Sequence, residues 1–332
     1  MATCRTILDH GTDDLGQEVR PHWPDGTPAH TYNAFGIVNR YNLQEEFPAV
    51  TLRKTYLKSA MDEILWIYQR KSNNVHDLNS HVWDEWADEK GSIGKAYGYQ
   101  MSVRHPVGGI TVDGLKKAFP GITAVESGRR SWYILAADAE ETQGMYTEDF
   151  RRFVEEKAIA EQQKGTGEWF MDQINYVIYQ LVNDPFSRRI MTTLWNPEEL
   201  TDMALAPCAY SVTFRVTEKY GTRYLNAVLN QRSNDMLAAG AWNVAQYALL
   251  VMMLAQVCDM KPGELVHVIA DAHIYDRHVP MIKELLKREP KPAPKVWLDP
   301  EVKDFYEFTT DNLHVEDYEV GGPQIKDISI AI

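Results

Sequence analysis

Residues 196–243 contain Asn196-Pro197-Glu198-Glu199-Leu200, Ala206-Pro207-Cys208-Ala209-Tyr210, Gln231-Arg232-Ser233-Asn234-Asp235 and Trp242-Asn243. In this stretch a thiol follows a proline, an Arg-Ser pair comes one predicted strand later, and an amide lies eight residues beyond Asp235. Such a set of side chains can hold a phosphorylated nucleotide while a sulfur atom attacks its base. We therefore expect the fold to be organised around this stretch.

The cysteine, arginine and asparagine of this stretch are candidate site residues. Only a thiolate is a strong nucleophile, and a nearby guanidinium lowers a thiol pKa, so Arg232 is the expected activator of Cys208. Arg232 and Ser233 also suit a phosphate, because a guanidinium makes paired charge-assisted bonds and a hydroxyl adds one donor. The Asn243 amide offers a donor and an acceptor side by side, which match O4 and N3–H of uracil. Cytosine presents the opposite pattern, for which an aspartic acid is the more natural partner.

These motifs resemble the active-site motifs of the thymidylate synthase family. That family has a Pro-Cys nucleophile, a Gln-Arg-Ser-x-Asp segment and a helix that starts Phe-Asn-Ile-Ala-x-Tyr, which correspond here to Pro207-Cys208, residues 231–235 and residues 242–247. The resemblance implies an α+β fold in which a mixed β-sheet packs against helices and mediates a homodimer. It also implies one catalytic domain over residues 1–332, with an inserted surface subdomain at about 104–168.

Composition and charge argue against several classes of protein. A chain of 332 residues, 44% of them hydrophobic, can form a large buried core. The formal net charge of −13 argues against a nucleic-acid or anionic-membrane partner, since such partners require basic surfaces. Three separated cysteines fit neither a disulfide framework nor a metal site, so we expect no metal and a reducing compartment.

The sequence also predicts a cytoplasmic protein. Its N-terminal residues show no apolar signal segment. Its longest apolar run, residues 245–258, is shorter than the roughly 20 residues that span a bilayer.

Residues 16–36 are rich in Gly, Pro, Asp and His, which predicts a loop rather than a helix or a strand. Arg20 lies in this loop, and a solvated arginine is the simplest interpretation. Bacillus-type variants of the family carry Val-Arg followed by Asp-Gly-Thr-Pro-Ala-His-Thr, and Val19-Arg20 and residues 25–31 match that pattern. The resemblance implies that Arg20 binds the nucleotide phosphate.

Candidates for proton transfer and for folate binding precede residue 100. Apolar residues at helical spacing predict a helix over residues 55–69, with Glu63 in its apolar part. A buried carboxylate has a raised pKa and can shuttle protons, although an edge position or an ion pair is the common alternative. The resemblance implies the relay role for Glu63 and help from Tyr97 in removing the C5 proton. It places Trp83 and Trp86 in a folate pocket, whereas paired tryptophans are otherwise more often core packing.

The middle of the chain combines a charged insertion with a pair of arginines. Residues 104–168 are charge-rich and predict a surface subdomain without chemistry, including a solvated helix at 147–163. A helix is predicted over residues 171–183 and ends at Asp184-Pro185. Arg188 and Arg189 follow in a turn, where arginines usually face solvent. The resemblance implies instead that both reach the phosphate site of the other subunit in the homodimer.

The C-terminal third of the chain contains further site candidates. Strands are predicted at 211–216, 223–230 and 265–269, with an apolar helix over 243–259. His273 and Tyr275 alternate on one side of an extended segment, so both can bond one ligand hydroxyl, and a structural histidine is the alternative. The resemblance implies that they bind the deoxyribose 3′-hydroxyl and that Gln231 belongs to the same nucleotide site. It gives Asp235 contacts to substrate and pterin, and it places the C-terminus around Ala331 over the folate.

The resemblance implies reductive methylation of deoxyuridine monophosphate (dUMP) to thymidylate (dTMP), with 5,10-methylenetetrahydrofolate as cosubstrate and a covalent bond between Cys208 and C6 of the base. Two residues depart from the family pattern, because Ala209 replaces the usual histidine and Ala239 replaces a glycine beside the pterin. The alternative is a pyrimidine-nucleotide 5-hydroxymethylase acting on dUMP, CMP or dCMP, in which water quenches the same intermediate. A nucleotide-binding regulator without turnover, with Cys208 as a buried apolar thiol, is the alternative outside catalysis.

Overall fold

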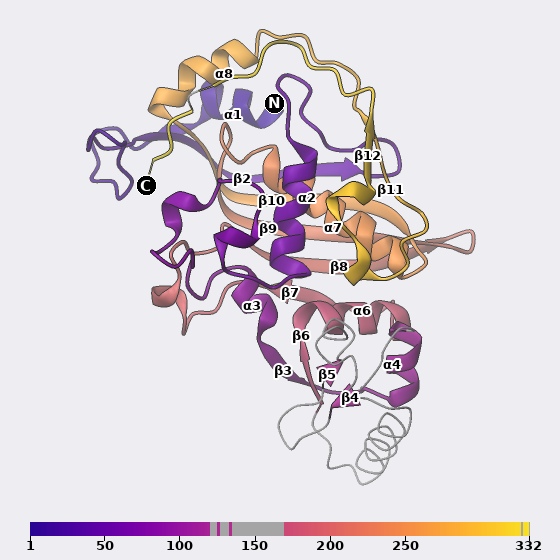
Figure 1. The fold of residues 1–332 in the computed structure, drawn as a ribbon. Helices are drawn as coiled ribbons and strands as arrows, with labels where there is room; N and C mark the ends of the chain where they lie inside the picture. Colours follow the sequence, from indigo (N-terminus) through magenta and orange to yellow (C-terminus); the bar gives the residue numbers. More distant parts are fainter. Residues whose placement is uncertain (120–124, 127–132, 135–168, 327, 332) are drawn as a thin grey trace.

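A mixed sheet lies at the centre of the computed structural model, which describes residues 1–119, 125–126, 133–134, 169–326 and 328–331. The sheet has six strands in the order β1-β2-β10-β9-β8-β7 (Figure 1). Strands β9 and β10 pair in parallel, and the other neighbours pair antiparallel. The predicted α+β fold with a mixed sheet is confirmed.

The central strands are longer than the sequence patterns indicate. The six strands are β1 Thr12–Asp13, β2 Thr31–Asn42, β7 Met191–Thr193, β8 Ala209–Lys219, β9 Thr222–Asp235 and β10 Lys261–Tyr275. Three smaller pairs join β3 Arg104–Val107 to β6 Trp169–Asp172, β4 Val125–Glu126 to β5 Tyr133–Ile134, and β11 Lys295–Leu298 to β12 Leu313–Glu316.

Helix α7 (Trp242–Val257) packs on β9 and β10 and against α2 (Leu57–Tyr68), as Figure 1 shows in front of the sheet. Helix α7 carries apolar side chains on all its faces, which is typical of a helix enclosed by other elements. The remaining α-helices of the described residues are α1 Ala2–His10, α3 Gly98–Ser102, α4 Val112–Ala118, α6 Gln173–Asn183 and α8 Val279–Leu285.

Two sequence predictions of local structure need correction. Residues 31–36, predicted as loop, form the first half of β2 because they pair with the end of β10, where Thr31 faces Tyr275. The predicted strand 265–269 is only the middle of β10, which begins at Lys261 and accommodates Pro262 and Gly263 at a bulge before Leu265. Backbone pairing across the sheet decides both cases, and local composition does not contain that information.

The predicted helices at 55–69 and 243–259 are confirmed as α2 and α7. The helix predicted at 171–183 starts at Gln173, because Met171 and Asp172 belong to β6. The Asp172 carboxylate caps the N-terminus of this helix by accepting a hydrogen bond from the Asn175 amide. The helix predicted at 147–163 lies outside the described residues.

At the edges of the predicted insertion, β3 and β6 pair so that Arg104 faces Asp172, and α4 packs on α6 (Figure 1). No helix among the described residues is long and apolar enough to cross a membrane. In the same part of the chain no group of three His, Cys, Asp or Glu side chains could hold a metal ion.

Candidate active site

Cys208 lies directly before β8, and Arg232 of β9 holds the backbone on either side of it. The Arg232 guanidinium donates from Nε to the Pro207 carbonyl at 3.0 Å and from Nη2 to the Ala206 carbonyl at 2.6 Å. Its Nη2 is 3.7 Å from Cys208 Sγ, and the Arg232 amide donates to the Cys208 carbonyl at 2.9 Å. The thiol and the guanidinium are therefore next to each other, as the sequence predicted.

The net charge effect on the thiol differs from the expectation. Burial raises the pKa of Cys208, and the nearby Arg232 and Arg20 guanidiniums lower it, with the result that the pKa stays above its ordinary value. The Arg232 guanidinium lowers the thiol pKa as expected, but burial outweighs that effect in the single chain. The thiol keeps its proton at neutral pH unless further positive charge or a proton acceptor is added.

Asn243 is fixed by a row of hydrogen bonds behind it. Gln231 Nε2 donates to Asn243 Oδ1 at 3.0 Å and to the Ser233 carbonyl at 3.0 Å. Gln231 Oε1 is 2.7 Å from Nε2 of buried His267, and since an amide oxygen only accepts, His267 donates. Asn243 Nδ2 donates to Gln246 Oε1 at 3.1 Å. One N–H and one lone pair of the Asn243 amide remain for a ligand, which is the pair that uracil requires.

Tyr97 has a backbone conformation that few non-glycine residues adopt, with φ 46° and ψ −103°. The neighbouring glycines allow it: a Cβ on Gly98 would lie 1.9 Å from the Ser72 carbonyl oxygen, and Gly94 has φ 70°. The Tyr97 hydroxyl accepts a hydrogen bond of 3.3 Å from the Cys208 amide. The structure thus brings the predicted proton-abstracting tyrosine to the nucleophile.

Glu63 is a buried carboxylate on α2 that faces the same region. Its Oε2 accepts a hydrogen bond of 2.8 Å from Trp242 Nε1. Burial raises the pKa of Glu63, while the hydrogen bond from Trp242 opposes that shift. A carboxyl group with a raised pKa is suited to proton transfer near neutral pH.

These residues line one cavity of about 350 Å³. Six predicted site residues contribute to it: Glu63, Trp83, Trp86, Tyr97, Cys208 and Asn243. The Trp83 ring is buried, and it packs at 5.6 Å against half-buried Trp86 and at 4.8 Å against Tyr97. Both tryptophans therefore pack in the interior and also form a cavity wall.

The C-terminal segment closes part of this cavity. Gln324 and Ile330 line it, and Ala331 is half-buried beside them. The Ser329 carbonyl lies 2.9 Å from Nε2 of buried His278, which connects the segment to the body of the protein. Ile332 lies outside the described residues.

The predicted sugar and phosphate residues lie near the nucleophile. Register between β9 and β10 places His273 opposite Asp235, and the rings of His273 and Tyr275 are 5.1 Å apart. Burial raises the pKa of Tyr275 to about 12, with smaller effects from the charges of Asp235, Arg20 and Cys208. Arg20 is exposed, and its charge lowers the pKa of both Tyr275 and Cys208.

Asp235 stays ionised in this buried place. Burial alone would raise the pKa of Asp235, but His278, His273 and the Ala238 amide outweigh it and lower that pKa. Two backbone amides, of Leu237 and Ala238, donate to Asp235 Oδ1 at 2.8 and 3.1 Å.

Arg188 and Arg189 are not brought to this cavity. Both are exposed in the turn before β7, and neither is among the residues that line this cavity.

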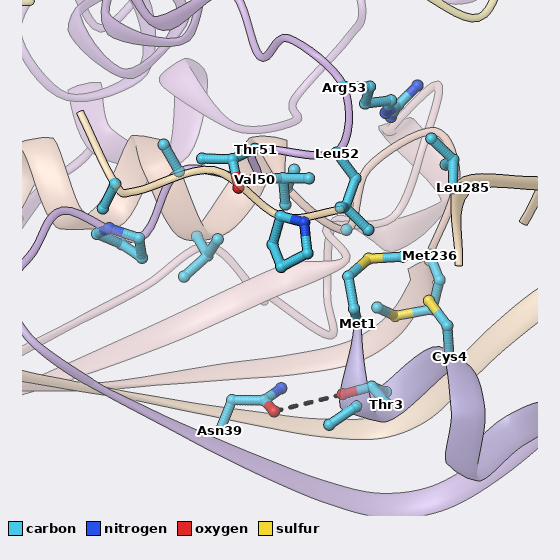
Figure 2. Close-up of a pocket in the computed structure, with 18 of the residues that line it drawn as sticks. Met1, Thr3, Cys4, Asn39, Val50, Thr51, Leu52, Arg53, Met236 and Leu285 are labelled. Atoms are coloured by element: carbon cyan, nitrogen blue, oxygen red, sulfur yellow. Dashed lines mark hydrogen bonds between the residues drawn. The ribbon is translucent and has the colours of Figure 1, made fainter. Parts of the chain in front are cut away.

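A second, larger cavity of about 500 Å³ lies beneath α1 (Figure 2). Cys4 and Met236 belong to one hydrophobic cluster there, and burial raises the pKa of Cys4. All the predicted site residues are in the described part of the chain, and none of them lines this cavity. The smaller cavity is therefore the candidate active site.

Sequence reasoning missed four residues that complete the site. They are Arg53, which donates to the Leu237 carbonyl and lines both cavities, and Trp242, His267 and His278. Trp242 is adjacent to Asn243, so its position gave a signal. The two histidines act through β10 pairing and the fold of the C-terminal segment, for which the sequence gives no signal.

Comparisons with known proteins show the family of this chain. The family model described as thymidylate synthase matches residues 1–331. "Thymidylate synthase 1" of Bacillus subtilis (strain 168) is 34% identical over 330 residues, covering 98% of this chain and 96% of the relative. "Thymidylate synthase" of Bacillus mojavensis is 36% identical over 321 residues, covering 96% of this chain and 92% of the relative.

A solved structure supports the same relation. Thermostable thymidylate synthase A from Bacillus subtilis superposes with a TM-score of 0.74 at 34% identity, covering 100% of this chain and 97% of the other. With the family model matched along nearly its whole length, and with the nucleophile, amide and carboxylate gathered at one cavity, this chain belongs to the thymidylate synthase family.

Proposed function

We propose that this chain catalyses the reductive methylation of dUMP to dTMP, with 5,10-methylenetetrahydrofolate as cosubstrate. The observation that supports it most is the position of Cys208 Sγ, 3.7 Å from Arg232 Nη2. The same thiol lines a cavity with Asn243, Tyr97 and Glu63. A nucleophile, a base-recognising amide and two proton-transfer groups therefore surround one space.

In the nucleotide site that we propose, the free N–H and lone pair of Asn243 bond O4 and N3–H of uracil. Arg20, Arg232 and Ser233 hold the phosphate, and His273 with Tyr275 holds the 3′-hydroxyl. Gln231 contributes by orienting Asn243, to which it donates at 3.0 Å. Anchoring the phosphate at a distance from the base supplies binding energy that orients C6 over the sulfur.

In the covalent step, the Cys208 thiol loses its proton to water and Sγ bonds to C6 while the C5–C6 double bond opens. The electron pair is delocalised onto O4, where the Asn243 N–H stabilises it. Tyr97 assists removal of the C5 proton, because its hydroxyl accepts from the Cys208 amide at 3.3 Å and lies beside the sulfur. Glu63 holds or releases a proton on the O4 side, consistent with its raised pKa.

The cavity walls fit a folate. Trp83 and Trp86 supply flat apolar surface, and Leu205, Ala238 and Ile330 add further apolar contacts. Arg53 and Lys54 lie in the same lining, which suits an acidic tail. The proposal also assigns a bond to a pterin N–H to Asp235, whose lowered pKa keeps it an acceptor. When bound, the folate supplies the one-carbon unit and the hydride. Closure of the segment around Ala331 would exclude water from the cavity.

The assembly that we propose is a homodimer formed through the sheet. Strand β2 exposes Phe35 by 89% and Val38 by 55%, which is unusual for large apolar side chains unless a partner covers them. In such a dimer Arg188 and Arg189 of one chain would reach the phosphate in the other chain. Their exposure in this chain supports that role.

The domain proposal is one catalytic domain with a surface insertion at about 104–168. The pairing of β3 with β6, where Arg104 faces Asp172, supports these boundaries because it closes the base of the insertion.

Absorbance at the dihydrofolate band tests the reaction after the protein, dUMP and methylenetetrahydrofolate are mixed. We expect a rise together with a product of the mass of dTMP. Consumption of dUMP without dihydrofolate, and a product heavier by one oxygen, would instead identify a 5-hydroxymethylase. Release of tritium from C5 of labelled dUMP distinguishes an enzyme from a nucleotide-binding regulator, which releases none.

A further inference from the structure

The first residue of α7 makes a contact that the proposed reaction does not yet use. Trp242 is half-buried, and its indole Nε1 donates to Glu63 Oε2 at 2.8 Å, which joins α7 to α2 at the cavity wall. The family motif quoted above has phenylalanine at this position. A phenylalanine has no donor, so this bond depends on the residue that this chain carries.

Few groups around Glu63 can stabilise its ionised carboxylate. On its own helix lies Asp62, which is paired with Arg70 at 2.8 Å. From other elements, the Tyr97 and Tyr247 hydroxyls interact with the Glu63 charge, and Trp83 and Gln246 lie near it as neutral groups.

The strand side of the site adds no polar group at the residue after the nucleophile. That residue, Ala209, is buried and has only a methyl group. A hydrogen bond from an N–H group in a buried site stabilises a carboxylate more than it would at the surface.

We propose that Trp242 is a positioning residue, which fixes Oε2 of Glu63 through its indole N–H and leaves Oε1 as the oxygen that exchanges protons in the cavity. This inference rests on the proposed function, because it assigns the proton carrier of that reaction. The geometry fits the assignment: the 2.8 Å bond is short, Trp242 and Glu63 both line the cavity, and Asn243 is the next residue of the same helix turn.

The pH dependence of turnover follows from this bond. Burial raises the pKa of Glu63, and the bond that Trp242 donates lowers it. Removing one charge-assisted donor shifts the balance toward the protonated acid, by about one pH unit. The acidic limb of the pH profile of kcat should therefore move to higher pH.

Trp242→Phe tests the inference, with Trp297→Phe as the matched control. Trp297 lies on β11, 38% exposed, and stacks on His314 at 5.3 Å between ring centres. We expect Trp242→Phe to move the acidic limb of kcat up by about one pH unit and to lower kcat about tenfold at the acid end, with the KM for dUMP changed less than about threefold. The control should keep the wild-type profile. A limb that stays in place while kcat falls would mean that Trp242 only fills space.

Two further variants keep the test decisive. Glu63→Gln should remove the acidic limb, and adding Trp242→Phe to it should then shift nothing. If Trp242→Phe does not fold, benzothienylalanine introduced at position 242 serves instead, since its sulfur replaces the N–H at nearly unchanged shape, and the same shift is expected. Wild-type protein that forms no dTMP would refute the proposed function, whereas wild-type turnover with an unmoved limb in the variants would refute only the role of Trp242.

Discussion

His267 should make the stability of this protein sensitive to mild acid. Burial lowers the pKa of His267 to about 4, from an ordinary value of 6.5. At a pH between about 4 and 6.5, His267 therefore stays neutral in the native protein, whereas the same side chain in the unfolded protein binds a proton. Stability contributed by the neutral form is complete above pH 6.5 and is lost as the pH falls toward about 4.

The size of the effect follows from the two pKa values. Between about pH 7.5 and about pH 5 the unfolded imidazole gains most of its proton and the native one gains little, which corresponds to about 2 kcal/mol of lost unfolding free energy. The same side chain orients Gln231, at 2.7 Å from its Oε1, and through it Asn243. A substitution that removes the His267 N–H leaves the buried Gln231 side-chain carbonyl without a partner, which costs about 1 to 3 kcal/mol of unfolding free energy.

Two substitutions separate the titration from the hydrogen bond. His267→Gln keeps an N–H donor and does not titrate, whereas His267→Leu removes both functions. Urea unfolding at fixed protein concentration and at both pH values gives the free energies. We expect the Gln variant to lose about 2 kcal/mol less than wild type on acidification, and the Leu variant to lose stability at both pH values with a raised KM for dUMP. An equal acid response in wild type and His267→Gln would refute the reasoning.

Three further predictions concern the site. Cys208→Ser should abolish tritium release from C5 of labelled dUMP while equilibrium dialysis still detects dUMP binding; residual release at the wild-type rate would exclude Cys208 as the nucleophile. Arg232→Lys should slow the alkylation of Cys208 by iodoacetamide at pH 8 about tenfold. The shorter, non-planar lysine cation cannot make both bonds to the Ala206 and Pro207 carbonyls, which are 2.6 and 3.0 Å long. Without them, the positive charge is no longer held beside the sulfur. Arg188→Ala with Arg189→Ala should raise the KM for dUMP at least tenfold, and mixing this variant with Cys208→Ser under conditions of subunit exchange should restore activity in the mixed dimer; no recovery would place both arginines outside the partner's site.

The residues of the site could be predicted from sequence because their spacing is local. Pro207-Cys208 and residues 231–235 are continuous motifs, and Asn243 lies at the start of a helix that its apolar pattern predicts. The structure places Cys208, Tyr97, Glu63 and Asn243 at one cavity as the motifs indicated. Their catalytic roles remain predictions.

Other features depend on pairing across the sheet and were not predictable. The length of β10 is set by its two neighbours, β2 and β9, so that Lys261 and Tyr275 lie in one strand despite Pro262. His267 reaches Gln231 only because β10 runs parallel to β9 in that register. Amino-acid composition carries no information about strand register, so the composition of residues 31–36 predicts a loop although they form a strand.

The protonation of the Cys208 thiol depends on the proposed dimer. Local sequence placed Arg232 beside Cys208 but could not weigh that charge against burial, and burial dominates in the single chain. Each added guanidinium shifts the thiol toward thiolate, as Arg232 and Arg20 do here, and Arg188 with Arg189 would add two more across a dimer. A sheet-mediated homodimer would then do more than cover Phe35 and Val38. It would supply positive charge where the isolated chain lacks it, so that nucleophile activation and subunit association depend on the same surface.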